Sequence, residues 1–471
     1  MKFRHITGAD IRALCTIVEP ARVLSGDEIS NDFDHDEMEG IHCPPQALIK
    51  VANAGETAAV LAFCNENKLP VVARGSGTGL VGGAVAIHGG VMLDMTLMNH
   101  ITQLDEKNMT VTVEPGVLLM DLAAFAESNG FFYPPDPGEK TATIGGNIST
   151  NAGGMRAVKY GVTRDYVLSL TVALADGSIE TFGAGTVKNS SGYSLKDLII
   201  GSEGTLAVIL SATMKLLPKP AASVSLLAGF ADFPQAIAAV PEILRSGTDP
   251  TAVEFLTRNA ISLTEDYLGK RFPCFEGSSA LLLTYDGGAE SEPKARAERA
   301  AELCLCAGAV DCYYVDTEER SKSVWQLRGA FFEAVKASAK QLDEGDVVVP
   351  RESITAFVAE LDRISNIGGL RVEYFGHAGD GNLHVYFCRD GMDETEWQRR
   401  LSACFDALYH EAAMLGGLVS GEHGIGYAKR IPLKRQLGEG QLALMRRIKN
   451  AFDPNGILNP SKICTFDDDL R

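Results

Sequence analysis

The chain has 471 residues, of which 45% are apolar and 22% charged, and its formal net charge at pH 7 is −18. These values are typical of an ordinary soluble globular protein with two or three domains. The negative charge, without any Lys/Arg-rich run, argues against binding to nucleic acid or to an acidic membrane surface.

No targeting signal or redox-cysteine motif is visible. No apolar run approaches the ~18 residues of a transmembrane helix, and the N-terminus lacks the small-residue cleavage site of a signal peptide. The ten cysteines are scattered, only Cys304 and Cys306 lie close together, and neither CxxC nor an iron–sulfur pattern occurs. We therefore expect a cytoplasmic protein with reduced thiols and no electron relay of its own.

A strand over residues 69–74 leads into a first glycine-rich loop at 75–83. The loop fits GxGxxG, but a dinucleotide-binding fold also needs a helix opening at the glycines and an acidic residue ~20 positions later. Here a glycine-interrupted strand over 84–94 follows, and Asp94 comes too early. We reject the Rossmann fold and retain a loop of backbone amides suited to a pyrophosphate, with Arg74 beside it.

The elements that follow indicate two different domains. A second loop, rich in glycine and in amide and hydroxyl donors, lies within 134–154, although alone it could be an ordinary connection. A hairpin turning at Asp176-Gly177 comes next. After a boundary near Pro220, strand–helix–strand patterns occur over 224–255 and again over 280–315. Two such units predict a ferredoxin-like split βαβ sheet.

The segment Gly376 to His384, GHAGDGNLH, lies between two predicted strands, 371–375 and 383–387. Its two histidines are seven residues apart, but the intervening Ala-Gly-Asp-Gly-Asn favours a tight turn over a helix. A hairpin would bring both imidazoles to the rim of a sheet, within reach of one ion. The alternative is that the histidines only satisfy hydrogen bonds of the turn.

A second short segment, SGEHGIG, adds Glu422 and His423. Two histidines and a carboxylate are a suitable ligand set for a divalent metal, and the remaining histidine is then available for proton transfer. Near the C-terminus, Leu444, Ile448 and Phe452 at four-residue spacing predict an amphipathic helix over 442–452, ended by Asp-Pro-Asn-Gly.

Several motifs in the same order resemble one family. RGSGTGLVGG, PPDPGEKTATIGGNISTNAGG, YGVTRDYVLSLTVALADG and GSEGTLAVI resemble the FAD-binding domain of the vanillyl-alcohol oxidase-type flavoproteins. The remainder resembles their glycolate oxidase, D-lactate dehydrogenase and D-2-hydroxyglutarate dehydrogenase branch, in which HxGDGNxH and GEHGxG mark the metal and substrate site. The resemblance covers roughly residues 40 to 463.

This resemblance implies an α+β fold in three parts. A PCMH-type FAD-binding domain of two subdomains would occupy 1–219, and a ferredoxin-like cap domain for the substrate 220–414. A C-terminal segment over 415–471 would be helical and return to the flavin. We expect non-covalent FAD, because the first glycine loop has no histidine of the kind that carries covalent flavin in other members.

The resemblance also implies which residues bind FAD. The pyrophosphate would lie on the two glycine-rich loops, and Glu203, Gly204 and Asn459 would line the flavin. The implied set is Arg74, Gly75, Ser76, Gly77, Thr78, Gly79, Pro135, Asp136, Thr143, Gly145, Gly146, Asn147, Thr150, Asn151, Gly153, Gly154, Glu203, Gly204 and Asn459.

For the reaction, the resemblance implies a D-2-hydroxy acid that is oxidised to a 2-oxo acid by hydride transfer to flavin. His377, His384 and Glu422 would hold a divalent metal that lowers the pKa of the substrate hydroxyl, and zinc, iron and manganese all suit this set. His423 would be the general base, with a fourth metal ligand as its alternative role. Arg328 would grip the substrate carboxylate, since a guanidinium matches it bidentately; a salt bridge on a helix surface is the alternative.

Two departures from the 2-hydroxyglutarate subgroup favour a small substrate, D-lactate or glycolate, over D-2-hydroxyglutarate. The stretch 341–346 is acidic where that subgroup has a lysine, so it would repel a second carboxylate. Tyr386, on the same strand face as His384, stands where that subgroup tends to have asparagine and would contact the substrate.

The sequence also bears on the electron acceptor, and two other functions compete with the proposed oxidation. The stretch 332–351 resembles FAD subunits of lactate dehydrogenases that work with an electron-transferring flavoprotein, which is the expected partner. The sequence leaves the oligomeric state open, with a homodimer as one option. A metallohydrolase that uses the same His/His/Glu set, and a non-catalytic nucleotide-binding module, are the rival functions; the first leaves the N-terminal glycine loops unexplained.

Overall fold

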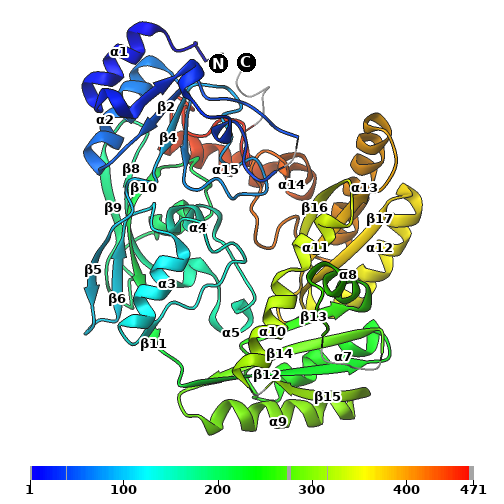
Figure 1. Cartoon of the computed structure of the whole chain (residues 1–471). Coiled ribbons are helices and arrows are strands. Elements are labelled where there is room, and N and C mark those ends of the chain that lie inside the picture. Colours follow the sequence, from blue (N-terminus) through cyan, green and yellow to red (C-terminus); the bar gives the residue numbers. More distant parts are fainter. Residues whose placement is uncertain (1–2, 39, 273–276, 316, 466–471) are drawn as a thin grey trace. The chain divides into compact units, whose positions relative to one another are not determined.

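The structure, a computed structural model, describes residues 3–38, 40–272, 277–315 and 317–465 (Figure 1). The chain divides into two compact units. Unit 1 is Met1–Ala152, Val162–Pro218 and His423–Arg471, and unit 2 is Gly153–Gly161 and Lys219–Glu422. Among the helices of the described residues, none combines the length and the hydropathy that crossing a membrane requires.

Unit 1 contains a four-stranded sheet that is parallel except at one edge. Its elements are β1 Val23–Ser25, β2 Ala47–Lys50, β3 Val71–Arg74 and β4 Val91–Asp94, with α1 Gly8–Ile17, α2 Ala54–Asn67, η1 Pro20–Arg22, η2 Gly26–Glu28 and η3 Asn31–Phe33. The strand order is β1-β2-β4-β3, and β4 is buried throughout, as expected for a parallel strand covered on both faces. Leu14 of α1, Leu61 of α2 and the C-terminal Leu458 share one core with the strands, so the end of the chain completes this part of unit 1.

The second sheet of unit 1 is antiparallel and five-stranded. Its strands are β5 Ile101–Asp105, β6 Thr110–Val113, β8 Val167–Ala173, β9 Ile179–Gly183 and β10 Val208–Lys215, in the order β5-β6-β10-β8-β9. The predicted hairpin at Asp176-Gly177 is confirmed: β8 pairs with β9, and Gly177 has a φ of +84°. The other elements of unit 1 are α3 Leu119–Ser128, α4 Ile144–Thr150, α6 Leu195–Ile199, α14 Arg430–Gln436, α15 Glu439–Phe452, η4 Thr163–Tyr166 and the short pair β7 Phe131–Phe132 and β11 Leu217–Pro218.

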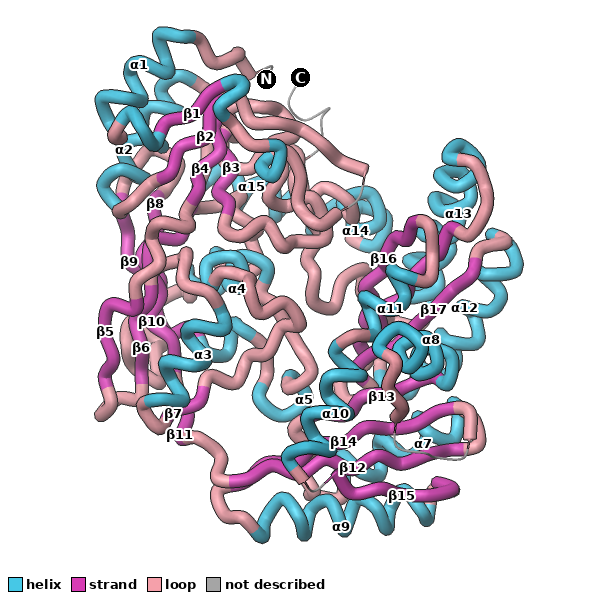
Figure 2. Tube along the Cα trace, in the orientation of Figure 1, coloured by secondary structure: helices cyan, strands magenta, loops and turns pink. Residues whose placement is uncertain are grey.

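Unit 2 is built on one seven-stranded antiparallel sheet (Figure 2). Its strands are β12 Ala222–Phe230, β13 Ala252–Thr257, β14 Ser279–Gly287, β15 Ala309–Val315, β16 Gln341–Val348, β17 Arg371–His377 and β18 Asn382–Arg389, in the order β15-β12-β14-β13-β17-β18-β16. The first four strands, with α7 Phe233–Arg245 and α9 Ser291–Cys306, have the ferredoxin-like order 4-1-3-2. The predicted split βαβ sheet is therefore confirmed, and β17, β18 and β16 extend it.

One face of this sheet carries the candidate site. The remaining elements of unit 2 are α5 Ala157–Tyr160, α8 Arg258–Leu268, α10 Glu318–Gly329, α11 Phe331–Ala337, α12 Ile354–Gly368, α13 Glu394–Met414 and η5 Arg351–Ser353. Leu327 of α10 and Phe331 of α11 share a core cluster with Leu256, Phe375 and Tyr386 of the sheet. Side chains on a strand alternate between the two faces of the sheet. Glu254, His377 and His384 each lie two positions from Leu256, Phe375 or Tyr386, so they share the face that α8, α10 and α11 cover.

Three local predictions were wrong in detail. The strand expected over 84–94 is formed only at Val91–Asp94. The sequence from Val324 to about Lys340 is typical of one helix, but the structure has two: the first begins at Glu318, the chain breaks at Ala330, and the second ends at Ala337. In α15 the expected helix exists, but Leu444 is 52% exposed and the buried residues are Leu442 and Lys449. The Lys449 ammonium donates to the carbonyls of Thr205 and Leu458, so specific hydrogen bonds replace the expected apolar stripe.

Candidate functional site

The two predicted histidines lie side by side on the β17–β18 hairpin. Phe375 pairs with His384 and His377 with Asn382, so the two imidazoles occupy diagonal positions on one face. Their ring centroids are 5.4 Å apart, and both residues are buried. The turn between them needs glycine at 381, because its φ is +90° and a Cβ there would lie 2.0 Å from the Val349 carbonyl oxygen. The predicted hairpin and its effect on the histidines are confirmed.

A buried carboxylate holds the first histidine from the neighbouring strand. Glu254 of β13 pairs directly with His377 of β17, and its Oε1 lies 2.6 Å from the His377 Nδ1. The other oxygen, Oε2, accepts hydrogen bonds from Arg328 Nε at 3.0 Å and Nη2 at 2.5 Å. The Glu254 side chain has no exposed surface, so its charge depends on these two partners.

A second carboxylate holds the second histidine in the same way. Glu344 of β16 pairs with Tyr386, two positions after His384, and its Oε1 is 2.9 Å from the His384 Nδ1 and 3.1 Å from the donating Tyr386 hydroxyl. Since both histidines use Nδ1 for a carboxylate, Nε2 is the atom that each ring would offer to a metal. Carboxylate–histidine pairs of this kind fix the tautomer and orientation of metal ligands.

The third predicted ligand is brought to the hairpin by a buried aspartate. Asp346 Oδ2 accepts hydrogen bonds from Ser420 Oγ at 2.7 Å, Gly421 N at 3.1 Å and Glu422 N at 3.0 Å. Its Oδ1 accepts from Asn382 Nδ2 at 2.7 Å. This fixes the SGE segment beside the histidines, and Glu422 Oε1 lies 3.3 Å from His377 Nε2.

The donor set fits a divalent metal. One ligand atom each from His377, His384 and Glu422 lie within 4.8 Å of one another. Atoms bound to a common zinc or similar ion at ~2.0–2.2 Å can be no further apart than about 4.4 Å, so only small side-chain movements are needed. All three residues belong to unit 2, so the set is complete within one unit.

The same geometry shifts the proton affinities of the site. Burial works against a charged His377, but the carboxylates of Glu254 and Glu422 raise its pKa well above the ordinary value. Burial likewise opposes charge on His384, and Glu344 raises the pKa of that ring. Burial would raise the pKa of Glu422, but His377 lowers it below the ordinary value. The carboxylates thus stabilise positive charge at this site, and protons on the two rings and a bound cation would compete for it.

Arg328 is buried and lies on the site face of unit 2. Its Nε and Nη2 bind Glu254, and its guanidinium lies 5.0 Å from the centroid of the Phe375 ring. No described residue accepts a hydrogen bond from Nη1. That nitrogen therefore has donors for a substrate carboxylate. The alternative expected from the sequence was a salt bridge on a helix surface; Arg328 does form a salt bridge, to Glu254, but in a buried position, since its side chain is only 9% exposed.

His423 is the first residue of the last segment of unit 1, while Glu422 is the last residue of unit 2. The peptide bond between them keeps their Cα atoms ~3.8 Å apart. The predicted metal ligand and the predicted base are therefore close together because they are neighbours in the sequence.

Unit 1 holds most of the residues predicted to bind FAD. The first loop follows β3, and Gly77 in it has a φ of +78°. The second loop contains α4, whose N-cap Thr143 accepts a hydrogen bond from the Gly146 amide at 3.2 Å. Gly75 is packed against this helix, because a Cβ at Gly75 would lie 2.1 Å from Thr143 Oγ1. The two predicted loops therefore come together within unit 1.

Buried polar atoms without partners show that these residues fit a polar cofactor. Nine side-chain atoms of the described residues are buried without a hydrogen-bond partner, and four of them lie in unit 1: Asn147 Nδ2, Asn459 Oδ1, Tyr133 OH and Asp36 Oδ2. Native structures rarely leave such atoms unpaired. Two of the four, Asn147 and Asn459, belong to the predicted FAD set, and a large, donor- and acceptor-rich ligand such as FAD would satisfy them.

Three residues of the predicted FAD set make hydrogen bonds to backbone groups of unit 1. Arg74 donates to the backbone carbonyls of Asp32 and His35, at 2.8 and 2.6 Å. Glu203 accepts from the amides of Ile425 and Gly426, at 2.7 and 2.6 Å. The Asn459 amide group donates to the carbonyls of Gly83 and Glu203.

Gly153 and Gly154 fall in unit 2. There a Cβ at Gly153 would lie 3.0 Å from the Glu422 side chain. Gly153 therefore leaves room for the predicted metal ligand, which is a different role from the one expected of it.

Sequence reasoning missed the carboxylates behind the ligands. Glu254 and Asp346 are fully buried. Glu254 is a single charged residue in an apolar stretch of strand, Ala252-Val-Glu-Phe-Leu, whereas Asp346 ends the acidic stretch 341–346 and is followed by three valines. Charged residues are almost never fully buried unless paired. That pattern was the signal available in the sequence.

The comparisons with known proteins agree with this organisation. Residues 45–183 match the family model of an FAD binding domain, and residues 219–463 match that of the C-terminal domain of FAD linked oxidases. The chain belongs to the FAD-linked oxidase family. The predicted resemblance and the presence of an FAD-binding domain are thereby confirmed.

Individual relatives of this FAD-linked oxidase cover nearly its whole length. It is 47% identical to a D-lactate dehydrogenase of Anaerostipes hadrus, over 95% of each chain. It is 37% identical to a glycolate oxidase subunit GlcD of Bacillus subtilis, over 92% of each chain. It is 32% identical to a D-2-hydroxyglutarate dehydrogenase of Stutzerimonas stutzeri, over 96% of this chain and 98% of the relative. This FAD-linked oxidase is therefore an FAD-dependent oxidoreductase and a homologue of D-lactate dehydrogenase.

A solved structure has the same fold. A p-cresol methylhydroxylase structure with bound substrate matches 98% of this chain and 98% of its own, with a TM-score of 0.81 at 18% identity. At that identity the match establishes the fold alone. The predicted α+β fold with a PCMH-type FAD-binding domain and a cap domain is confirmed.

Proposed function

We propose that this FAD-linked oxidase is a metal-dependent dehydrogenase that oxidises D-lactate to the 2-oxo acid. The observation that carries the proposal is the His377, His384 and Glu422 cluster, with a carboxylate on the Nδ1 of each histidine. The 47% identity to a D-lactate dehydrogenase supports D-lactate over other acids. Glycolate and D-2-hydroxyglutarate are the alternatives, supported by the GlcD and D-2-hydroxyglutarate dehydrogenase relatives.

Each residue of the proposed site has one task. His377, His384 and Glu422 would hold the metal, and the two glycine loops of unit 1 would hold FAD. When bound, the metal supplies Lewis acidity toward the substrate hydroxyl and FAD accepts the hydride from its carbon. His423 takes the hydroxyl proton at an imidazole nitrogen. Arg328 fixes the substrate carboxylate through Nη1, the nitrogen that Glu254 leaves open.

The buried carboxylates keep these groups in place. Glu254 binds both Arg328 and His377, so one side chain fixes the distance between the carboxylate donor and the metal ligand. This is a positioning role, because Glu254 has no exposed surface with which to touch substrate. The reduced enzyme would pass its electrons to an electron-transferring flavoprotein, as the likeness of residues 332–351 to subunits that work with such a partner suggests.

An anaerobic visible spectrum of the FAD- and metal-loaded protein tests the proposal. We expect the flavin bands to bleach on addition of D-lactate, and not with L-lactate, glycolate or D-2-hydroxyglutarate at the same concentration. E422Q should retain the flavin bands and lose the bleaching. Bleaching by another D-acid alone would replace the substrate, and bleaching of metal-stripped protein at the full rate would contradict the role of the metal. An H423N variant with near-normal turnover would show that His423 is not the base.

A further inference from the structure

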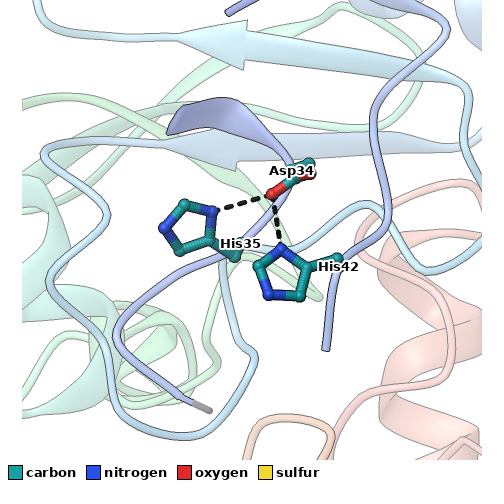
Figure 3. Close-up of side chains that lie close together, drawn as sticks. All are labelled: Asp34, His35 and His42. Atoms are coloured by element: carbon teal, nitrogen blue, oxygen red, sulfur yellow. Dashed lines mark hydrogen bonds and ion pairs between the residues drawn. The ribbon is translucent and has the colours of Figure 1, made fainter. Parts of the chain in front are cut away.

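A second group of metal-ligating side chains lies in unit 1, directly after η3. Asp34 Oδ1 is 2.7 Å from His35 Nδ1 and 2.9 Å from His42 Nδ1. Figure 3 marks both contacts with dashed lines, and both imidazoles point toward the same oxygen of Asp34. The two imidazole rings have centroids 5.0 Å apart. One ligand atom from each of the three residues lies within 4.8 Å of the other two. Two histidines and one carboxylate thus converge on one point, outside the site proposed for the substrate.

The backbone on both sides of the group is fixed. The Cys43 amide donates to the Asp34 carbonyl at 2.7 Å, which closes the segment into a loop and sets His35 and His42 opposite each other. The Asp34 amide donates to Asn31 within η3, and the Arg74 guanidinium donates to the His35 carbonyl at 2.6 Å. Only side-chain rotations are then needed to adjust the three ligand atoms, so most of the entropy cost of forming a site is already met.

The donors have the chemistry of a zinc-class site. Imidazole nitrogen and carboxylate oxygen bind Zn²⁺ at ~2.0–2.2 Å, and tetrahedral ligands around such an ion are about 3.4 Å apart. The distances in this group are shorter by about 0.6 Å, and its side chains can open because Asp34, His35 and His42 are 20%, 41% and 62% exposed. Without a metal, hydrogen bonds between such exposed groups contribute little to stability.

The surrounding charge favours a cation. Residues 27–39 include seven Asp and Glu and no Lys or Arg, in a chain of net charge −18. Two nitrogens of the Arg74 guanidinium face this segment, and they donate to the carbonyls of Asp32 and His35 rather than to the three ligand side chains. Three ligands leave at least one coordination position open to water, which is typical of a site that exchanges its metal.

We propose that Asp34, His35 and His42 bind a divalent cation of the zinc class, separately from the ligand set in unit 2. The cation would link the two ends of the loop that Cys43 and Asp34 close. Because Arg74 at the start of the FAD loop is bonded to the same segment, the bound cation would also stabilise that end of β3. The inference does not depend on the proposed substrate or reaction.

Metal counting in the full chain tests it. Chelator-treated, FAD-loaded protein is titrated with Zn²⁺ by calorimetry, and retained zinc is measured by mass spectrometry after gel filtration. We expect two equivalents in the unaltered chain and one in the double variant H35N/H42N. E422Q should lose the other equivalent and keep the one bound here, and the triple variant should bind none.

A matched control separates this site from an ordinary histidine–carboxylate pair. His100 Nδ1 lies 2.8 Å from Glu114 Oε2 on the surface of unit 1, with one imidazole and one carboxylate. H100N should therefore leave the zinc count unchanged. Equal zinc counts in the unaltered chain and in H35N/H42N would overturn the inference, and so would a loss of the same equivalent in H100N. An unchanged count in E422Q would instead contradict the proposed function and leave this inference standing.

Discussion

Replacing Glu344 by glutamine tests whether the carboxylates behind the histidines control metal binding. The Glu344 Oε1 is 2.9 Å from His384 Nδ1, and both side chains are only 9% exposed, so water does not readily replace the lost contact. Glutamine keeps the size and can accept from the Tyr386 hydroxyl, but it removes the charge. Losing such a partner weakens metal affinity about 10–100-fold, or roughly 1.4–2.7 kcal/mol. We expect a loss in that range with the fold intact.

The assay is a competitive Zn²⁺ titration at about pH 8.5, two units above the ordinary histidine pKa. Glu344 raises the pKa of His384, so its removal also makes protons weaker competitors for that ring, which would hide part of the loss of metal affinity. A high pH reduces this effect, because fewer protons compete with the metal. E114Q is the matched control, since Glu114 holds His100 at 2.8 Å on the surface and should leave zinc affinity unchanged. An affinity of E344Q within threefold of the unaltered protein would refute the reasoning, provided that thermal melting shows both proteins folded.

Three other outcomes follow from contacts of single residues. R328K keeps the charge but loses the guanidinium fork, so we expect the KM for D-lactate to rise at least ~10-fold with a smaller change in kcat, measured by steady-state kinetics; an unchanged KM would remove Arg328 from the substrate site. G381A places a Cβ 2.0 Å from a carbonyl oxygen at a φ of +90° and should cost about 1–3 kcal/mol in urea unfolding, whereas G391A, with open space around it, should not. Burial lowers the pKa of Lys462 to about 8, so its contribution to stability is present above the ordinary value of 10.5 and lost as pH falls through 8. The K462M variant lacks this titration. Between pH 7.5 and 10 the free energy of unfolding of the unaltered chain should therefore rise by up to about 3 kcal/mol more than that of K462M. If the two proteins show parallel pH curves, the charge of Lys462 is not buried in this way.

The hairpin of the site could be predicted because its determinants are local. Strand-forming residues flank Ala-Gly-Asp-Gly-Asn, and the register of the turn alone places His377 and His384 on one face. The glycine loops of unit 1 were found for the same reason. The ferredoxin-like order of the sheet in unit 2 followed from two strand–helix–strand patterns, whose periodicity is also a local property.

The partners of these residues could not be predicted, because they are distant in sequence. Glu254 lies 123 positions before His377, and Glu344 lies 40 positions before His384. Only the strand order β13-β17-β18-β16 brings them opposite the histidines. In α15 the apolar spacing misled, because Lys449 is buried by three hydrogen bonds that no periodicity reveals.

The acidic side chains of the stretch 341–346 are already engaged with other residues of the protein, which the sequence did not reveal. Its two site-facing carboxylates have protein partners: Glu344 holds His384, and Asp346 holds the segment that carries Glu422. Local repulsion of a substrate carboxylate is therefore weakened. We expect the net charge still to discriminate, because five carboxylates would exceed the cationic charge of a bound divalent metal and Arg328 by two; they belong to Glu254, Glu344, Asp346, Asp380 and Glu422. A monocarboxylate such as D-lactate adds one more negative charge and D-2-hydroxyglutarate two, at a site where burial makes each unpaired charge costly. On this argument the structure favours the smaller acid through its total charge rather than through any single residue of the stretch.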